Sequence, residues 1–278
     1  MNACLPLLIT FDGLARSGKG TIVHAVKRSL HNEKGYKVML IDAGQIFRVL
    51  VVAAMRHGVD IEDPSAIDHF LQDERNIDAS VRLVKDVYHM TKVERNALLY
   101  TNEVGRNSAK IGARPLSQIF KDSLLRKWMR DAHEESYEIV LLDGRALEET
   151  GEMLEREKLC VFTAHFYFVC DPEVGARRTL GFANTSYTLL SPEDAQSVDE
   201  LVVQINERNE ADQTRKIQPI VPPHGASTFQ LPNVPPFLQT TSRPSAIIDT
   251  SGEMTIDEMT RPMSTYISEI IDSKLADY

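Results

Sequence analysis

The stretch Gly13-Leu14-Ala15-Arg16-Ser17-Gly18-Lys19-Gly20-Thr21 follows an apolar run at residues 7–11 and the acid Asp12. It matches the pattern Gly-x-x-x-x-Gly-Lys, continued here by Gly-Thr. In such a loop the backbone N–H groups wrap around phosphate oxygens, so small residues stand where the backbone approaches the ligand closely. The stretch therefore predicts a phosphate cradle, and all of its residues are expected to bind a nucleoside triphosphate.

The residues around this loop support the same interpretation. Lys19 supplies a positive charge to the β- and γ-phosphates, and Thr21 offers a hydroxyl to Mg²⁺. A helix is expected next, because Ile22, Val26 and Leu30 recur at helical spacing, and its N-terminal partial positive charge faces the anion. The alternative is a glycine-rich turn that only joins a strand to a helix. Arg16 either adds charge to the triphosphate or points to solvent, and both orientations stay open.

Composition limits the classes of function. The chain has 278 residues and a formal net charge of -9, which disfavours nucleic acids and anionic membranes as partners. Its three cysteines show no metal-binding spacing and fit a reducing compartment. No apolar run approaches the roughly 20 residues that span a bilayer. We therefore expect a cytoplasmic protein with small-molecule partners and no membrane association.

Five short apolar runs recur along the chain, and helical segments separate them. None alternates polar with apolar residues, which is typical of parallel strands buried on both faces. Most of these runs end in an acid, and polar residues at strand ends are where open α/β sheets bind ligands. The sequence thus predicts an α/β fold with a five-stranded parallel sheet. The runs are residues 7–11, 38–41, 139–142, 165–169 and 246–248, followed by Asp12, Asp42, Asp143, Asp171 and Asp249.

The remaining segments complete the expected organisation. Helices are expected at residues 116–133, 197–212 and 256–274 from their spacing of apolar residues. Residues 58–106 are too long and too charged for a simple connection, which favours a small insert domain. Residues 219–244 hold seven of the 13 prolines and are expected to form an irregular surface loop.

Arginines follow successive predicted strands. Phosphoryl transfer requires positive charge on the oxygens of both anionic substrates, and one lysine is not enough for two. Taken singly, each arginine is more often a solvated surface charge, but their positions after strand ends make the set informative. Arg208, Asp212 and Arg215 are spaced so that they share one face of a helix. The other members are Arg48, Arg145, Arg177 and Arg178.

With these residues in place, the chain resembles the cytidylate kinase family of nucleoside monophosphate kinases. The matching stretches run in the family's order over nearly the whole chain, which makes them far more specific than the P-loop alone. Outside the loop, they are 42–48 (Asp-Ala-Gly-Gln-Ile-Phe-Arg), 103–105, 111–115, 143–145 (Asp-Gly-Arg), 176–178, Glu207-Arg208 with Asp212 and Arg215, and 248–250.

The resemblance implies a P-loop NTPase fold with an NMP-binding insert and a mobile lid. The core would be residues 1–57 and 113–278, the insert 58–112 and the lid about 174–196. It implies ATP and Mg²⁺, and a monomer. Thr21 and Asp143 would hold the metal, although Asp143 can also simply order its loop. The catalytic set would be Lys19, Arg145, Arg177, Arg178 and Arg215. The acceptor would be held by Asp42, Arg48, Arg145, Arg208, Asp212 and Arg215.

The departures from the family pattern gather at the base of the acceptor. The family reads cytosine with a serine, an arginine and an acid, and the corresponding positions here are Ala109, Gln118 and Ala146. Ser108 restores one contact if the local register shifts. One explanation is a changed acceptor base, as in UMP, dTMP or a 5-substituted dUMP, because Gln118 can pair with an amide-like edge. The other explanation is a divergent cytidylate kinase that still takes CMP or dCMP.

Two other classes of function compete with a nucleoside monophosphate kinase. A non-catalytic nucleotide-binding regulator would keep the fold and lose the transfer arginines. A kinase of a non-nucleotide small molecule would have no acceptor phosphate for Arg48, Arg208 and Arg215 to bind. The retained arginines disfavour both alternatives.

Overall fold

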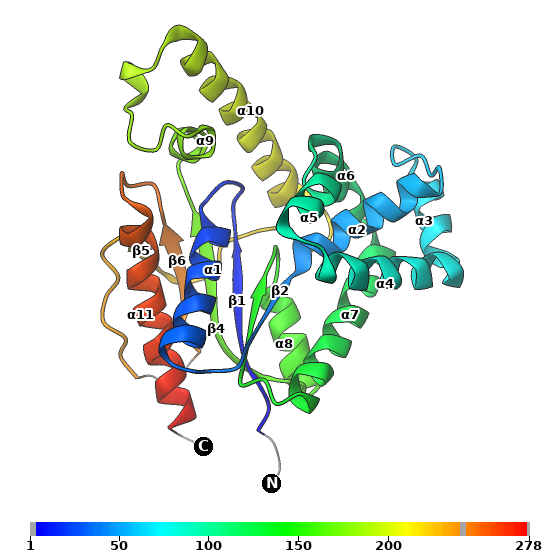
Figure 1. Cartoon of the computed structure of the whole chain (residues 1–278), viewed down its shortest axis with the longest axis horizontal. Helices are drawn as coiled ribbons and strands as arrows, with labels where there is room; N and C mark the ends of the chain where they lie inside the picture. The colour runs from blue at the N-terminus through cyan, green and yellow to red at the C-terminus, as the bar shows by residue number, and fades with distance from the viewer. Residues whose placement is uncertain (1–3, 240–242, 277–278) are drawn as a thin grey trace. The chain divides into compact units, whose positions relative to one another are not determined.

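The computed structural model of the chain describes residues 4–239 and 243–276. It contains an α/β fold built on a six-stranded sheet in the order β2-β3-β1-β4-β6-β5 (Figure 1). The strands β1–β3, β1–β4, β4–β6 and β5–β6 pair in parallel. The strand bounds are β1 Leu7–Gly13, β2 Val38–Asp42, β3 Ile139–Asp143, β4 Val161–Val169, β5 Ser227–Gln230 and β6 Ser245–Asp249.

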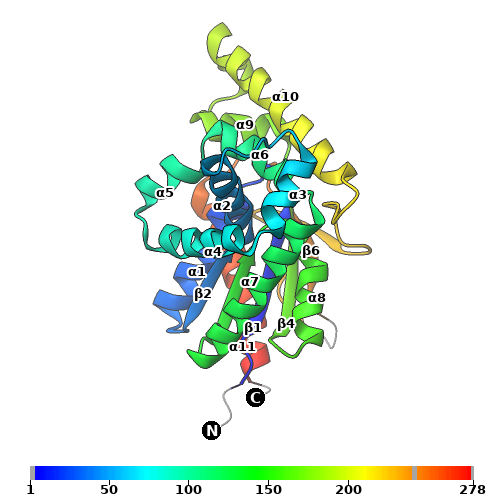
Figure 2. The same ribbon diagram turned by 90° about the vertical axis from the view of Figure 1, so that its right-hand side faces the viewer.

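Helices cover the two faces of this sheet, as the apolar strands predict. Every residue of β1 is buried, which requires cover on both sides. On one face α1 (Lys19–Arg28) packs against α11 (Ile256–Leu275), and their apolar residues join one core cluster with β1, β4 and β6. The helix α8 (Glu148–Arg156) contacts β1 and β4, and in Figure 2 it lies to the right of these strands, whereas α1 lies to their left. The expected fold class is confirmed.

The expectation of five strands was wrong, because the proline-rich segment contributes a sixth. In β5, Ser227 to Gln230 pair with β6 from Ala246 to Asp249 at the edge of the sheet. The strand has four residues, and three of them are exposed. Such a strand has no apolar run to detect, and only its partner in the fold reveals it. Residues 240–242 of the expected irregular loop, and residues 1–3 and 277–278 of the expected core, lie outside the described residues.

The chain divides into two compact units. The first, here called the sheet unit, comprises Met1–Ile41, Met129–Thr214 and Pro219–Tyr278. The second, here called the helical unit, comprises Asp42–Trp128 and Arg215–Gln218. The expected insert at 58–112 falls inside the helical unit, which also takes in residues on both sides of it.

Helices pack against one another within each unit. In the helical unit, α2 packs mainly against α6 and also against α4 and α5. In the sheet unit, α9 packs against α10. Within residues 4–239 and 243–276, none of the helices combines the length with the apolar composition of a membrane span. The remaining bounds are α2 Ala43–Arg56, α3 Pro64–Gln72, α4 Glu74–His89, α5 Lys92–Leu99, α6 Asn102–Gly112, α7 Pro115–Glu134, α9 Pro172–Leu180 and α10 Pro192–Thr214, with a π turn at Ser29–Glu33 and a 3₁₀ turn at Tyr187–Leu189.

Candidate functional site

The phosphate loop joins β1 to α1, and its glycines are required by its geometry. Gly13 has φ 139°, and a Cβ built there would lie 2.2 Å from the carbonyl oxygen of Phe168 on β4. The N–H of Leu14 donates to that same oxygen at 2.9 Å, so the loop begins pressed against the neighbouring strand. Gly18 caps α1 in the left-handed region, with φ 75° and no side-chain cap. The first turn of α1 therefore presents backbone N–H groups of the kind that bind phosphate.

The middle of the loop is held by α9 and α10. The N–H of Ala15 donates to Oδ1 of Asn209 at 2.8 Å. Arg16 has φ 59°, and a Cβ at Gly175 would lie only 3.0 Å from its carbonyl oxygen, so α9 passes directly against the loop. The side chain of Arg16 is exposed. Sequence reasoning did not find Asn209, because nothing separates it from any other polar residue of a long helix.

Lys19 lies at the start of α1 and turns toward the end of β3. Its Nζ pairs closely with Oδ1 of Asp143 and donates to the carbonyl oxygen of Gly144 at 3.0 Å. The two charged side chains are 14% and 17% exposed, so each partly neutralises the other in a shielded place. The structure thus brings together the two residues expected to serve the phosphates and the metal.

The oxygen donors expected for Mg²⁺ fit that ion by their chemistry. Thr21 offers a hydroxyl in the first turn of α1, and Asp143 offers a carboxylate, which are ligands that Mg²⁺ accepts alongside water and substrate phosphates. No group of three or more histidine, cysteine or acidic side chains suited to a metal occurs within residues 4–239 and 243–276.

Asp12 links the phosphate loop to the loop that follows β3. Its side chain is 3% exposed, with Oδ1 accepting from the N–H of Gly13 at 2.8 Å and Oδ2 from the N–H of Leu147 at 2.8 Å. Ala146, which directly precedes Leu147, has φ 55°. This left-handed conformation is costly for a residue with a Cβ. Ala146 is one of the positions where the family's base-reading side chains are replaced.

Two arginines are organised by one buried carboxylate. Asp212 on α10 is 7% exposed, and its Oδ2 pairs closely with Nη1 of Arg145, which is 21% exposed. Nε of Arg208 lies 3.9 Å from the same oxygen. Both arginines adjoin residues that contact the phosphate loop, since Gly144 accepts from Lys19 and Asn209 from Ala15. Positive charge is thus concentrated beside the phosphate cradle.

The two arginines expected in a lid, Arg177 and Arg178, both contact the loop after β6. Arg177 donates Nε to Glu173 at 3.0 Å and Nη1 to the carbonyl oxygen of Thr185 at 2.8 Å, and it pairs with Glu253. Arg178 donates to the carbonyl oxygens of Thr250, at 2.7 Å, and of Gly252. Arg177 is 5% exposed, so neither its position nor its partners are those of a solvated surface charge. No pattern in the sequence indicated Glu253.

The residues expected to bind the acceptor are divided between the two units. Asp42, Arg48 and Arg215 belong to the helical unit, and the sheet unit contains the others, Arg145, Arg208 and Asp212. Asp42 caps α2 by accepting from the N–H of Gln45 at 3.2 Å, and its Oδ2 accepts from the hydroxyl of Tyr100 at 3.1 Å. Arg48 donates to the carbonyl oxygen of Leu99 at 2.8 Å and lies over the ring of Tyr100, 4.6 Å from its centroid. Burial and the charge of Asp42 raise the pKa of Tyr100, so its hydroxyl stays a donor. Sequence reasoning missed Tyr100, which follows a helix and not a strand.

Two of the positions expected to face the acceptor's base lie in the helical unit, and their surroundings differ. Ala109 on α6 is exposed, and Ser108 donates its hydroxyl to the carbonyl oxygen of Gly105 at 2.8 Å. Gln118 on α7 is 6% exposed and donates Nε2 to the carbonyl oxygen of Gly112. Its Oε1 has no hydrogen-bond partner among the described residues. Arg215, also in this unit, donates Nε to the carbonyl oxygen of Gln218.

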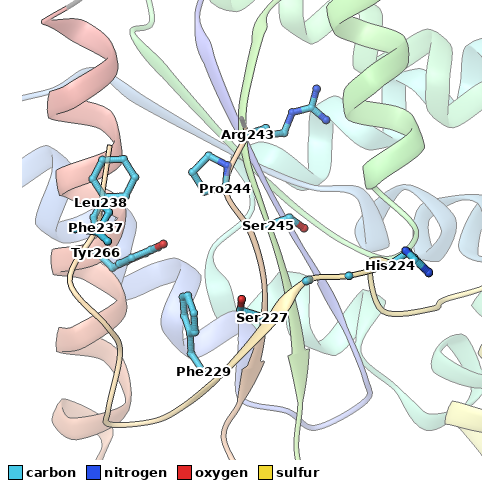
Figure 3. A pocket seen from close by; sticks show the side chains of 11 residues that line it. His224, Ser227, Phe229, Phe237, Leu238, Arg243, Pro244, Ser245 and Tyr266 are labelled. Carbon is cyan, nitrogen blue, oxygen red and sulfur yellow. The ribbon is translucent and has the colours of Figure 1, made fainter. Parts of the chain in front are cut away.

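A separate cavity of about 330 Å³ lies at the proline-rich segment (Figure 3). It is lined by the rings of Phe229, Phe237 and Tyr266, and by Ser227 and Ser245. These serines begin β5 and β6, so the cavity lies toward the amino ends of those strands, whereas the phosphate loop follows the carboxyl end of β1. It is therefore distinct from the phosphate cradle.

Comparisons with known proteins agree with these features. A family model described as cytidylate kinase matches residues 9–231. The cytidylate kinase of Colwellia psychrerythraea (strain 34H) is 26% identical over 231 residues, which cover 80% of this chain and 87% of that protein. The cytidylate kinase of Serratia proteamaculans (strain 568) is 27% identical over 275 residues, 98% of either chain. Among solved structures, the crystal structure of APE1195 covers 96% of this chain at 14% identity, with a TM-score of 0.42, too low to support an inference.

Proposed function

The chain belongs to the cytidylate kinase family of nucleoside monophosphate kinases, and we propose that it transfers the γ-phosphoryl group of ATP to a pyrimidine (deoxy)nucleoside 5′-monophosphate. In this reaction an oxygen of the acceptor's phosphate forms a new bond to the γ-phosphorus, and the bond to the oxygen bridging the β- and γ-phosphorus breaks. The products are ADP and a nucleoside diphosphate.

The pairing of Asp212 with Arg145, with Arg208 beside the same carboxylate, is the observation that carries this proposal. Holding guanidinium groups in fixed positions is valuable where charge moves between phosphate oxygens, because the protein's part in phosphoryl transfer is alignment and electrostatic stabilisation. A non-catalytic nucleotide-binding protein has no need for such a set. A kinase with an uncharged acceptor would need fewer arginines.

We assign the phosphate loop of the sheet unit to the donor. The acceptor's phosphate and the transferring group are assigned to Arg145 and Arg208 of the sheet unit together with Arg48 and Arg215 of the helical unit. The loop from Gly13 to Thr21 binds the triphosphate, and Lys19 exchanges Asp143 for the β- and γ-phosphates when ATP binds. Mg²⁺, held through Thr21 and Asp143, would neutralise phosphate charge when bound. Arg177 and Arg178 serve as the lid arginines that close over the phosphates and exclude water.

In the helical unit, Arg48 and Arg215 hold the acceptor's phosphate. Asp42 and Tyr100 keep Arg48 in place, one by capping its helix and the other by lying under its guanidinium.

The environment of Gln118 bears on the acceptor's base. A carbonyl oxygen only accepts, so the end of the amide that lies against Gly112 must be the nitrogen, and Oε1 is the free end. A buried acceptor left unpaired costs about 1–3 kcal/mol, which a ligand that supplies a donor would recover. We propose that the base donates to this oxygen, through the N4 amine of cytosine or the N3–H of uracil or thymine.

The test is an acceptor panel with ATP as donor. ADP formation is measured with CMP, dCMP, UMP, dTMP and a 5-substituted dUMP, and with no acceptor. The proposal requires ADP formation that depends on a pyrimidine monophosphate. If none of these acceptors supports ADP formation, the alternative of a non-catalytic nucleotide-binding regulator is favoured. A wide preference for CMP and dCMP would show that the replaced base readers have not changed the acceptor.

A further inference from the structure

The helical unit contains a fully buried lysine. Lys121 on α7 is 1% exposed, which makes it one of the largest fully buried side chains of the described residues. An ammonium group is costly to remove from water unless it is paired and hydrogen-bonded. A methionine would fill the same space without that cost, so the retained charge calls for a reason.

The partners of Lys121 lead to the turn that carries Arg215. Nζ of Lys121 donates to Oε1 of Gln218 at 3.3 Å and lies 3.1 Å from Oδ1 of its neighbour Asp122. Gln218 has φ 47°, a left-handed conformation that costs a residue with a Cβ on the order of 1 kcal/mol and must be held by its surroundings. The carbonyl oxygen of this same residue accepts from Nε of Arg215. Gln218 thus connects the two cations: its side chain accepts from the ammonium of Lys121, and its backbone accepts from the guanidinium of Arg215.

The course of the chain gives this contact its importance. Residues Arg215–Gln218 belong to the helical unit, whereas the residues on both sides of them belong to the sheet unit. The turn is four residues long, and its last residue, Gln218, accepts at Oε1 from Nζ of Lys121 on α7 at 3.3 Å. Lys121 therefore holds the turn, and with it Arg215, against α7 of the helical unit.

We propose that Lys121 is a positioning residue for Arg215, which holds its guanidinium where the acceptor's phosphate binds. This inference rests on the proposed kinase function and assigns Lys121 no contact with substrate. A guanidinium displaced by an ångström loses much of its effect on phosphoryl transfer, on the order of 100-fold. We therefore expect the ammonium to matter for catalysis more than for the stability of the fold.

The first experiment compares substitutions at both ends of the contact. Lys121→Met keeps the length and apolar stem of the side chain and removes the donor. Gln218→Met removes the acceptor at a half-buried position, where misfolding is a small risk, and Gln218→Glu keeps an acceptor. We expect kcat/KM for the acceptor to fall on the order of 10- to 100-fold in both methionine variants and to be largely retained in Gln218→Glu. Lys127→Met, at an exposed lysine of the same helix, is the control and should match the unaltered enzyme.

The second experiment separates positioning from a general structural role. In an Arg215→Met background, Lys121→Met should lower kcat/KM little further, because the group it positions is already gone. An equal fall in both backgrounds, or full activity of Gln218→Met, overturns the proposal. Failure of the proposed function is distinguishable, since the unaltered enzyme would then form no acceptor-dependent ADP with any monophosphate.

Discussion

Asp212 and Arg145 form a close ion pair in which the carboxylate is 7% exposed and the guanidinium 21% exposed. Asp212 lies near the carboxyl end of α10, and Arg145 lies in the loop after β3. The carbonyl oxygen of Asp212 also accepts from the N–H of Ile220 at 3.0 Å, which fixes the chain just beyond the helix. One residue thus holds an arginine from another element and the end of its own helix.

Asp212→Asn tests this relationship. The amide keeps the shape of the side chain and removes the charge that orients Arg145 and Arg208, so we expect kcat with the best acceptor to fall on the order of 100-fold. The helix and the bond to Ile220 should persist, so the thermal midpoint is expected to fall by only a few degrees. Steady-state kinetics and thermal unfolding measure the two effects. Glu210→Gln, an exposed change on the same helix, is the control, and a full kcat in Asp212→Asn contradicts the role.

Alanine substitutions at two glycines of the phosphate loop should have different effects on the free energy of unfolding. At Gly13 a Cβ would lie 2.2 Å from the carbonyl oxygen of Phe168, and φ is 139°, so Gly13→Ala is expected to destabilise the fold by on the order of 3 kcal/mol or more. At Gly20 a Cβ meets nothing within 4 Å, so Gly20→Ala should leave the free energy of unfolding nearly unchanged. It should still weaken ATP binding, because the methyl group stands where the backbone approaches phosphate. Denaturant unfolding and ATP titration distinguish the two, and equal stability of both variants would refute the structural part.

The base readers can be restored together. The triple variant Ala109→Ser, Gln118→Arg and Ala146→Asp returns the side chains of the family pattern. If these positions read the base, the ratio of kcat/KM for CMP to that for UMP should rise about 10-fold or more. Ile119→Arg is the control, because it adds an arginine at an exposed neighbouring site of α7. A ratio that stays the same in the triple variant would show that the base is read elsewhere.

His165 gives the fold a dependence on pH. It is 1% exposed on β4, and its Nδ1 lies 2.8 Å from the hydroxyl of Thr10 on β1. Burial lowers its pKa to about 4, against an ordinary value of 6.5. Between pH 6.5 and pH 4, His165 is therefore protonated in the unfolded chain and neutral in the folded chain. Its neutral, buried form contributes fully to the free energy of unfolding above about pH 6.5, and this contribution is lost as the pH falls toward 4.

The expected loss from this one residue is roughly 2–3 kcal/mol between pH 7 and pH 4. Urea unfolding at several pH values measures it. His165→Gln should be less stable at pH 7 and should show a shallower fall with acid, while His224→Gln, at an exposed histidine, should follow the unaltered protein. An unchanged slope in His165→Gln would show that other groups cause the acid dependence.

Local patterns were enough to predict most of the fold. The helices expected at 116–133 and 256–274 are present as Pro115–Glu134 and Ile256–Leu275. They could be predicted because the spacing of their apolar residues is a local property of the sequence. The apolar strands were found for the same reason. The strand Ser227–Gln230 was missed because it has no such pattern and depends on pairing with residues 246–249.

The sequence alone determined the phosphate loop, because its chemistry requires particular residues at consecutive positions, and it determined which arginines to examine, because they follow the strands. Only the tertiary structure decided how those residues are paired. Three of these pairings are the ion pairs Asp212–Arg145 and Glu253–Arg177 and the hydrogen bond from Nε2 of Gln118 to the carbonyl oxygen of Gly112. They depend on contacts between residues that are not neighbours in the sequence. Such contacts are set by packing and by the need to satisfy buried polar groups, and neither can be read from neighbouring residues in the chain.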